Sequence, residues 1–280
     1  MSNEVFLITG IKGFISTHVY ELILKKYPNS KVYGTGTNKY FISDKNKLKK
    51  ITSKDFYYLI SLEKKITIIH LATFFSLKEE DKNKIYLANI QHGTKVIMNV
   101  NPIKVKHFIY LNTLYSFSEK FEIKNSYYVK TKNEFSKYLE EISLIYKFKY
   151  SEIFIDNTFG INDKRKKLIP IIISESKKNK KLKLKTPNEF INLVHVENVC
   201  ISIIECLKSN GKKVILVSKY DIKVEEIQKL IFNYINNKKS KFELTKKINN
   251  YKKLELENFE KNEVDIDYKV KFKELCLELQ

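Results

Sequence analysis

With 280 residues, of which 43% are hydrophobic, the chain has the material for a large core, and this composition excludes an intrinsically disordered protein. We expect one large core with a smaller lobe attached. No apolar run approaches the ~18 residues that span a bilayer, and the first apolar segment, at 5–10, follows only a few polar residues, so neither membrane insertion nor secretion is indicated.

The formal net charge of +20 raises nucleic acid as a partner, because clustered cations neutralise phosphates. Arg165 is however the one arginine among the 52 basic residues, whereas proteins that read phosphates and bases favour arginine. The lysines are also spread along the chain. We therefore expect a solvated lysine-rich surface and, next, an anionic substrate that profits from the positive field. No nucleic acid and no membrane is expected as a partner, and nucleic-acid binding stays a distant alternative.

The three cysteines are too few and too far apart for a disulfide framework, and no CxxC pair is present to hold a metal. This usage is typical of the reducing cytoplasm, where we expect the protein to act. We expect no metal site.

Short apolar runs alternate with helical segments from the start of the chain. A strand at 5–10, a helix over 13–26 and a strand at 31–36 form a parallel βαβ pattern. Further strands are expected at 66–72, 107–112 and 151–156, with helices over 79–100 and 127–147 between them. The pattern predicts an α/β Rossmann-type fold with a doubly wound parallel sheet, whose ligand crevice lies at the carboxyl ends of the strands.

After Gly160 the chain becomes lysine-rich and less regular. We interpret 1–160 as the dinucleotide-binding domain with the catalytic residues, and 161–280 mainly as a smaller substrate-binding lobe interleaved with the end of the sheet. Segment 237–263 is the least readable and is expected to be partly mobile. The other elements expected here are strands at 181–185 and 214–218 and helices over 166–179, 196–208 and 223–236.

The segment TGIKGFIS directly follows the first strand and places Gly10 and Gly13 where that strand passes into a helix. Backbone amides and the helix dipole then face the space above the turn, which suits a pyrophosphate. Two glycines three apart can also simply form a tight turn. This motif alone therefore does not establish a pyrophosphate site. Ser16 stands where a third glycine is usual.

A second group of residues suits proton transfer. Tyr128 and Lys132 are four apart, on one face of the expected helix. A tyrosine is protonated up to about pH 10, and a neighbouring cation favours its phenolate. Thr113 ends the strand at 107–112, where its hydroxyl could hold a substrate oxygen while Tyr128 donates a proton. A solvated helix face and a loop-capping threonine are the plainer alternatives.

Seven motifs in chain order resemble the extended short-chain dehydrogenases, which include the NAD-dependent epimerases and dehydratases of nucleotide sugars. They are TGIKGFIS, IIHLAT (68–73), NIQHGT (89–94), SYYVKTK, DNTFG (156–160), LIP (168–170) and LVHVENV (193–199). The short stretch between Thr113 and Tyr128 is similar to the abequose and paratose synthase branch, which reduces nucleotide-linked 4-keto-deoxyhexoses. Leu114 and Tyr115 follow the threonine where the family's dehydratases carry Asp and Glu, so dehydration is not expected.

The resemblance implies a role for each matching residue. Thr113, Tyr128 and Lys132 would be catalytic, and the helices at 79–100 and 127–147 would pair in a homodimer. Substrate contacts would come from Thr73, Asn157, Phe159 and His195, although His195 could equally be a packed structural residue. Besides Tyr128 and Lys132, the implied cofactor contacts are Gly10, Lys12, Gly13, Phe14, Ile15, Asp55, Phe56, Leu71, Ala72 and Asn89.

The specificity for NAD or NADP depends on the residue at the end of the second strand, where an acid would bind the ribose of NAD and repel the 2′-phosphate of NADP. The sequence there is GTGTNKY, without an acid, and Asn38 and Lys39 are available to a phosphate. NADP is therefore favoured over NAD. Asp55 and Phe56, which resemble an adenine-side contact, are explained nearly as well as a helix cap and a core aromatic.

Together these residues predict an NADPH-dependent reductase of a nucleotide-linked 4-keto-6-deoxy or 3,6-dideoxyhexose, in the biosynthesis of surface-polysaccharide sugars. One alternative is a nucleotide-sugar 4-epimerase with tightly bound NAD. Another is a non-catalytic NADP-binding regulator, because a fold alone never proves turnover.

Overall fold

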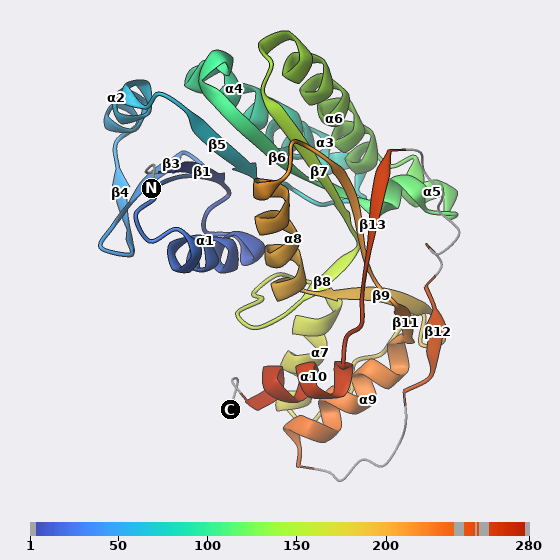
Figure 1. Ribbon diagram of the computed structural model, residues 1–280. Helices are drawn as coiled ribbons and strands as arrows, with labels where there is room; N and C mark the ends of the chain where they lie inside the picture. The colour runs from blue at the N-terminus through green and yellow to red at the C-terminus, as the bar shows by residue number, and fades with distance from the viewer. Residues whose placement is uncertain (1–3, 238–243, 250, 252–257, 278–280) are drawn as a thin grey trace. The chain divides into compact units, whose positions relative to one another are not determined.

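The computed structural model (Figure 1) describes residues 4–237, 244–249, 251 and 258–277. These residues form two compact units. The first comprises the described residues up to Phe154 together with Cys200–Ile215, and the second comprises Ile155–Val199 and the described residues from Leu216 onward. No helix among the described residues is long and apolar enough to cross a membrane.

The first unit is built on strands that follow one another in the order β10-β7-β6-β5-β1-β2-β3-β4 within a nine-stranded sheet of the described residues. β1 pairs in parallel with β2 and with β5, and β5 pairs in parallel with β6. The elements up to β7, in chain order, are β1 (Val5–Thr9), α1 (Phe14–Lys26), β2 (Lys31–Gly36), β3 (Lys39–Asp44), β4 (Lys47–Ile51), α2 (Ser53–Leu62), β5 (Ile66–His70), the 3-10 turn η1 (Glu79–Asp81), α3 (Lys82–Tyr86), the π-helical turn η2 (Leu87–Gln91), α4 (His92–Val100), η3 (Pro102–Lys104), β6 (Val105–Thr113), η4 (Leu114–Phe117), α5 (Phe121–Lys124), α6 (Tyr127–Tyr146) and β7 (Lys149–Ile155).

Helices cover both faces of this sheet, as the βαβ pattern predicts: α4 and α6 run along one face and α1 lies on the other (Figure 1). From β1 the chain runs first to β2 on one side and returns later to β5 on the other side, so the strand order reverses at β1. Such a switch point opens a crevice at the carboxyl ends of the two inner strands. The Rossmann-type α/β fold is therefore confirmed.

The second unit has its own core and a smaller sheet with strand order β12-β11-β9-β8. β8 and β9 are parallel, whereas β11 is antiparallel to both of its neighbours. Helix α8 (Val196–Lys208) and strand β10 (Lys213–Ser218) each have residues in both units. The remaining elements are β8 (Asn157–Phe159), α7 (Leu168–Lys177), β9 (Phe190–His195), β11 (Tyr220–Lys223), α9 (Val224–Ile235), β12 (Lys246–Ile248), β13 (Phe259–Val264) and α10 (Tyr268–Leu277).

Two expectations are corrected, and one hairpin was not predicted. Segment 181–185 forms no strand, because Leu182 packs against the core of the second unit without a partner strand. The helix expected over 79–100 is divided by the π-helical turn η2. An antiparallel hairpin, β3–β4, follows β2; its turn at Lys45 and Asn46 has positive φ at both residues, as in a type I′ turn. Part of the segment 237–263, which was expected to be partly mobile, lies outside the described residues, at 238–243, 250 and 252–257.

The packing of Gly34 in β2 gives a testable prediction. A methyl group there would lie 2.4 Å from Cδ1 and 2.7 Å from Cγ2 of Ile11, in the turn after β1. At Gly36, in the same strand, it would meet only the Phe41 ring, at 3.8 Å. We expect Gly34→Ala to reduce the free energy of unfolding by about 1–3 kcal/mol, and Gly36→Ala to change it by less than about 0.5 kcal/mol. Urea denaturation measures both, and equal effects would contradict this packing.

Candidate functional site

The turn after β1 forms a cradle of backbone. Gly10 has φ of +65°, and a Cβ there would lie 3.0 Å from the Cα of Ala72. The amide of Gly13 donates to the carbonyl of Gly10 at 2.7 Å, and no side chain caps the start of α1 at Gly13. The first amides of a helix have no partner within the helix, so they suit an anionic group. The turn therefore fits the pyrophosphate of a dinucleotide.

Thr9 joins this turn to the segment that follows β5. Its Oγ1 accepts hydrogen bonds from the amides of Leu71 and Ala72, each at 3.1 Å, and lies 3.0 Å from Nδ1 of His70. Leu71 and Ala72 are thereby held beside Gly10, at the switch point of the sheet. Sequence reasoning missed Thr9, although a threonine directly before the glycine turn was a visible signal.

Polar groups gather at the end of β2. Asn38 has φ of +51° in the turn before β3, Lys39 begins β3, and both are exposed. Exposed Lys12, from the glycine turn, places its Nζ 5.3 Å from the centre of the Phe41 ring in β3. Phe14 is buried at the start of α1 and Ile15 is half-buried beside it. Two lysine side chains thus flank the end of this strand.

Asp55 and Phe56 lie at the start of α2. Asp55 accepts a hydrogen bond from the hydroxyl of Thr52 at 2.7 Å, and its amide donates to the same oxygen at 3.1 Å. Phe56 is 2% exposed and packs against Tyr33 and Tyr40 in the core. The structure thus places these two residues as a helix start and a core aromatic, and a cofactor contact for them stays a prediction.

The hydroxyl of Tyr128 interacts with two threonines. Tyr128 lies in the first turn of α6, which Ser126 caps by accepting from the amide of Val129 at 3.4 Å. Burial raises the pKa of Tyr128 to about 12, and hydrogen bonds with Thr73 and Thr113 oppose that rise. Two candidate groups from separate strand ends, after β5 and at the end of β6, are thus brought to one phenol.

Asn89 holds the segment after β5 against α6. Its Oδ1 accepts from the Thr73 hydroxyl at 2.9 Å and from the Phe74 amide at 3.0 Å, while its Nδ2 donates to Thr131 at 3.2 Å. Asn89 is 1% exposed and lies in the π-helical turn η2. π-helical turns frequently occur at functional sites. In the structure Asn89 positions Thr73, and a cofactor contact for it stays a prediction.

Lys132 lies one turn after Tyr128 and is buried. Its Nζ donates to the carbonyl of Leu111 at 2.5 Å and lies 4.2 Å from the centre of the Tyr110 ring. Burial lowers the pKa of Lys132 to about 7, and the charge of Glu152 opposes that fall. Sequence reasoning missed Glu152, although a charged residue inside the apolar strand SEIFID was a signal.

The remaining candidate residues belong to the second unit. Asn157 donates to Asp156 at 2.9 Å, beside the start of β8. Phe159 is fully buried, and its ring packs on Phe272 and against His195. Nδ1 of His195 lies 3.3 Å from a carboxylate oxygen of Glu197. The Phe159 ring is thus a core side chain, and substrate contacts for all three candidates stay predictions.

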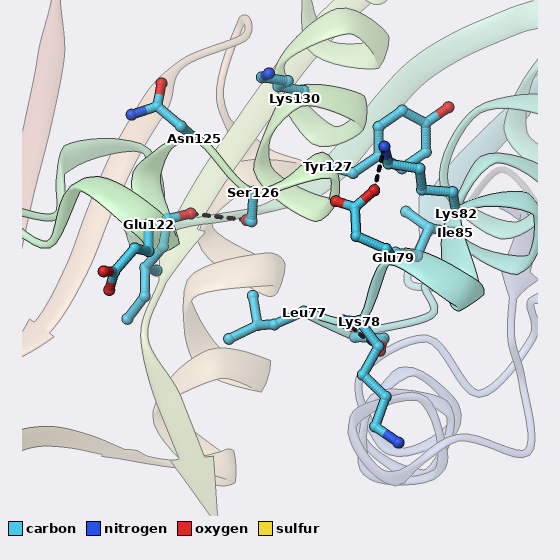
Figure 2. A pocket seen from close by; sticks show the side chains of 12 residues that line it. Leu77, Lys78, Glu79, Lys82, Ile85, Glu122, Asn125, Ser126, Tyr127 and Lys130 are labelled. Atoms are coloured by element: carbon cyan, nitrogen blue, oxygen red, sulfur yellow. Dashed lines mark hydrogen bonds and ion pairs between the residues drawn. The ribbon is translucent and has the colours of Figure 1, made fainter.

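A cavity of about 400 Å³ opens between the segment before α3 and the start of α6 (Figure 2). Tyr127 lines it, whereas Tyr128, Thr113 and Lys132 do not. The Ser126 hydroxyl that caps α6 also lines it, donating to the carbonyl of Ile123 at 2.7 Å. We therefore treat this cavity as separate from the Tyr128 group. The other lining residues are Ser76, Leu77, Lys78, Glu79, Lys82, Ile85, Glu122, Asn125 and Lys130.

Comparison with known proteins identifies the family. Residues 6–219 match the model of the NAD dependent epimerase/dehydratase family. The chain belongs to this family. The resemblance to the extended short-chain dehydrogenases is thereby confirmed, and the matched region, from β1 to the end of β10, covers most of the chain.

Individual relatives are distant. The chain is 21% identical to the CDP-abequose synthase of Salmonella muenchen over 79% of this chain and 75% of that protein. Among solved structures, it is similar to the UDP-glucose 4-epimerase of Thermotoga maritima with UDP-glucose, at 17% identity, TM-score 0.73 and coverage of 98% and 97%. It is also similar to RMD from Pseudomonas aeruginosa with NADPH, at 12% identity, TM-score 0.71 and coverage of 99% and 97%. At these identities the structural likeness shows the fold.

Proposed function

We propose that this protein uses NADPH to reduce the keto group of a nucleoside-diphosphate 4-keto-6-deoxy or 3,6-dideoxyhexose. The observation that carries the proposal is the buried Tyr128 phenol at the ends of two neighbouring strands, where the hydroxyls of Thr73 and Thr113 oppose the rise in its pKa that burial causes. A carbonyl oxygen placed there would meet a proton donor and a second hydroxyl. The similarity to CDP-abequose synthase, over most of both chains, supports this choice of substrate class.

The cradle at Gly10 and Gly13 would hold the pyrophosphate of the dinucleotide, with Leu71 and Ala72 beside it. When bound, NADPH supplies the hydride that reduces the keto carbon. The end of β2 favours NADP, because Lys12 and Lys39 would attract a 2′-phosphate where no acid repels it.

Tyr128 acts as the proton donor. Because its pKa lies at about 12, it carries its proton at neutral pH and gives it to the substrate oxygen as that oxygen gains negative charge. Thr113 orients that oxygen. The phenolate left on Tyr128 is stabilised by protonated Lys132, one turn away. Tyr128 then regains a proton from solvent.

Other contacts are proposed from the family resemblance. Asn157 and His195 would contact the nucleotide sugar. The homodimer and the cytoplasmic location stay predictions. Exposed apolar side chains on α3, α4 and α6 and in η2 support a dimer through these helices, namely Tyr86, Leu87, Met98, Leu144, Ile145 and Tyr146.

A nucleotide-sugar 4-epimerase is the second candidate, and the likeness to the Thermotoga maritima 4-epimerase favours it. Such an enzyme keeps its NAD bound and returns it unchanged. The lack of an acid at the end of β2 speaks against tight NAD binding. A non-catalytic NADP-binding regulator is a third reading, but it leaves the grouping of buried Tyr128 and Lys132 with Thr113 without a use.

The proton-donor role is tested by NADPH oxidation at 340 nm with CDP-, dTDP- and GDP-linked 4-keto-deoxyhexoses. One of these sugars should be reduced by the wild type, and Tyr128→Phe should lower kcat by at least about 100-fold, because general acid catalysis contributes that much. Tyr127→Phe is the matched control, since Tyr127 precedes Tyr128 in α6 but lines the separate cavity. Equal loss in both variants, or no oxidation with any sugar, would contradict the proposal.

Cofactor choice is tested at the end of β2. Replacing Lys12 or Lys39 by Gln should raise the KM for NADPH about tenfold, the effect of losing one charged hydrogen bond to a phosphate, and should leave the KM for NADH unchanged. Lys50→Gln, an exposed position on β4 of the same hairpin, is the control and should change neither value. Parallel changes in the two KM values would show that these lysines do not read the 2′-phosphate.

A further inference from the structure

A carboxylate is buried in the interior of the first unit. Glu152, in β7, is fully buried, and its Oε1 accepts a hydrogen bond from Nδ2 of Asn112 at 2.6 Å. Within the described part of the chain, its Oε2 has no hydrogen-bond partner. Burying a charge is costly unless that charge is paired, so Glu152 is not explained by stability.

Glu152 is connected to the catalytic group through three consecutive residues at the end of β6. Leu111 accepts from the Nζ of Lys132 at 2.5 Å. Asn112 donates to Glu152 with its Nδ2 and accepts, with its Oδ1, from the amide of Thr113 at 2.8 Å. One amide side chain therefore joins the buried carboxylate to the residue that orients the substrate oxygen.

The charges around this carboxylate come from the neighbouring strands and from α6. Burial raises the pKa of Glu152, and contacts with Ser136 and Asn112 and the charge of Lys213 oppose that rise. Lys213, at the start of β10, also forms an ion pair with Glu140 of α6. Lys132 is buried and makes no ion pair shorter than 4 Å in the described structure, but it lies close enough for the charge of Glu152 to raise its pKa. The other titratable groups that face Glu152 or Lys132 are Tyr110, Tyr128, Tyr150 and His70.

We propose that Glu152 is a positioning residue: its hydrogen bond to Asn112 holds Thr113 in place beside Tyr128, and its buried carboxylate serves as the counter-charge of buried Lys132. The inference rests on the proposed roles of Lys132 and Tyr128 in reduction. A neutral Lys132 could no longer stabilise the phenolate. Glu152 thereby widens the pH range over which Tyr128 can give up its proton.

The sign of the effect follows from the two charges. Burial disfavours the ammonium of Lys132 and brings its pKa to about 7, even with Glu152 present. Removing the negative charge withdraws the group that opposes this fall, so Lys132 would lose its proton at a lower pH. The shift should be about one pH unit, the lower end of what a nearby opposite charge produces.

The experiment follows Lys132 directly in the free protein. Lysine is labelled with ¹³C at Cε, and the Lys132 signal is identified by its absence in Lys132→Met. We expect a titration midpoint near pH 7 in the wild type and about one unit lower in Glu152→Gln. Glu152→Met, a second neutral variant of similar length, serves if the first does not fold. Glu140→Gln, on partly exposed α6, should leave the midpoint unchanged.

Equal midpoints in the wild type and in a folded neutral variant would overturn the inference, whatever happens to thermal stability. Because no substrate is present, this result does not depend on the proposed reaction. The alkaline limb of kcat should move down by the same amount if the wild type reduces a keto-sugar. Should the wild type reduce none, the proposed function fails while the titration still decides the role of Glu152.

Discussion

The carboxyl end of β6 supports the polar groups on which the proposed chemistry depends. Consecutive residues there accept from the ammonium of Lys132, connect to the carboxylate of Glu152 and present the hydroxyl of Thr113 to Tyr128. A strand in the middle of a parallel sheet is among the most rigid parts of a fold. Placing these groups on one such strand keeps their spacing fixed while a substrate enters and leaves.

A second constraint acts at the neighbouring strands. Gly10 lets the turn after β1 approach Ala72, and Thr9 ties both segments together through backbone amides. Asn89 extends the connection from Thr73 to α6. The backbone cradle proposed for the pyrophosphate and the hydroxyls around Tyr128 are therefore parts of one hydrogen-bonded framework. A cofactor bound in the cradle would thus have a fixed position relative to Tyr128, the proposed proton donor.

Local sequence signals pointed to many residues of the candidate site. The glycine turn, the strand end at Thr113 and the spacing of Tyr128 and Lys132 are readable because each depends on one strand or one helix turn. The alternation of strands and helices predicted the doubly wound sheet for the same reason. The hairpin β3–β4 escaped prediction because its turn uses Lys45 and Asn46 instead of glycine. Glu152 and Asn112 were missed because their meaning depends on pairing between separate strands.

The central claim is net reduction with Tyr128 as proton donor, as opposed to epimerisation with a cofactor that returns unchanged. The most direct measurement uses NADPH fully deuterated at C4 of the nicotinamide, with the keto-sugar substrate, and determines the label in the product by NMR. Our account predicts one deuterium on the former keto carbon for each NADPH consumed. A keto-sugar recovered unreduced and without deuterium, with NADPH left intact, would contradict it.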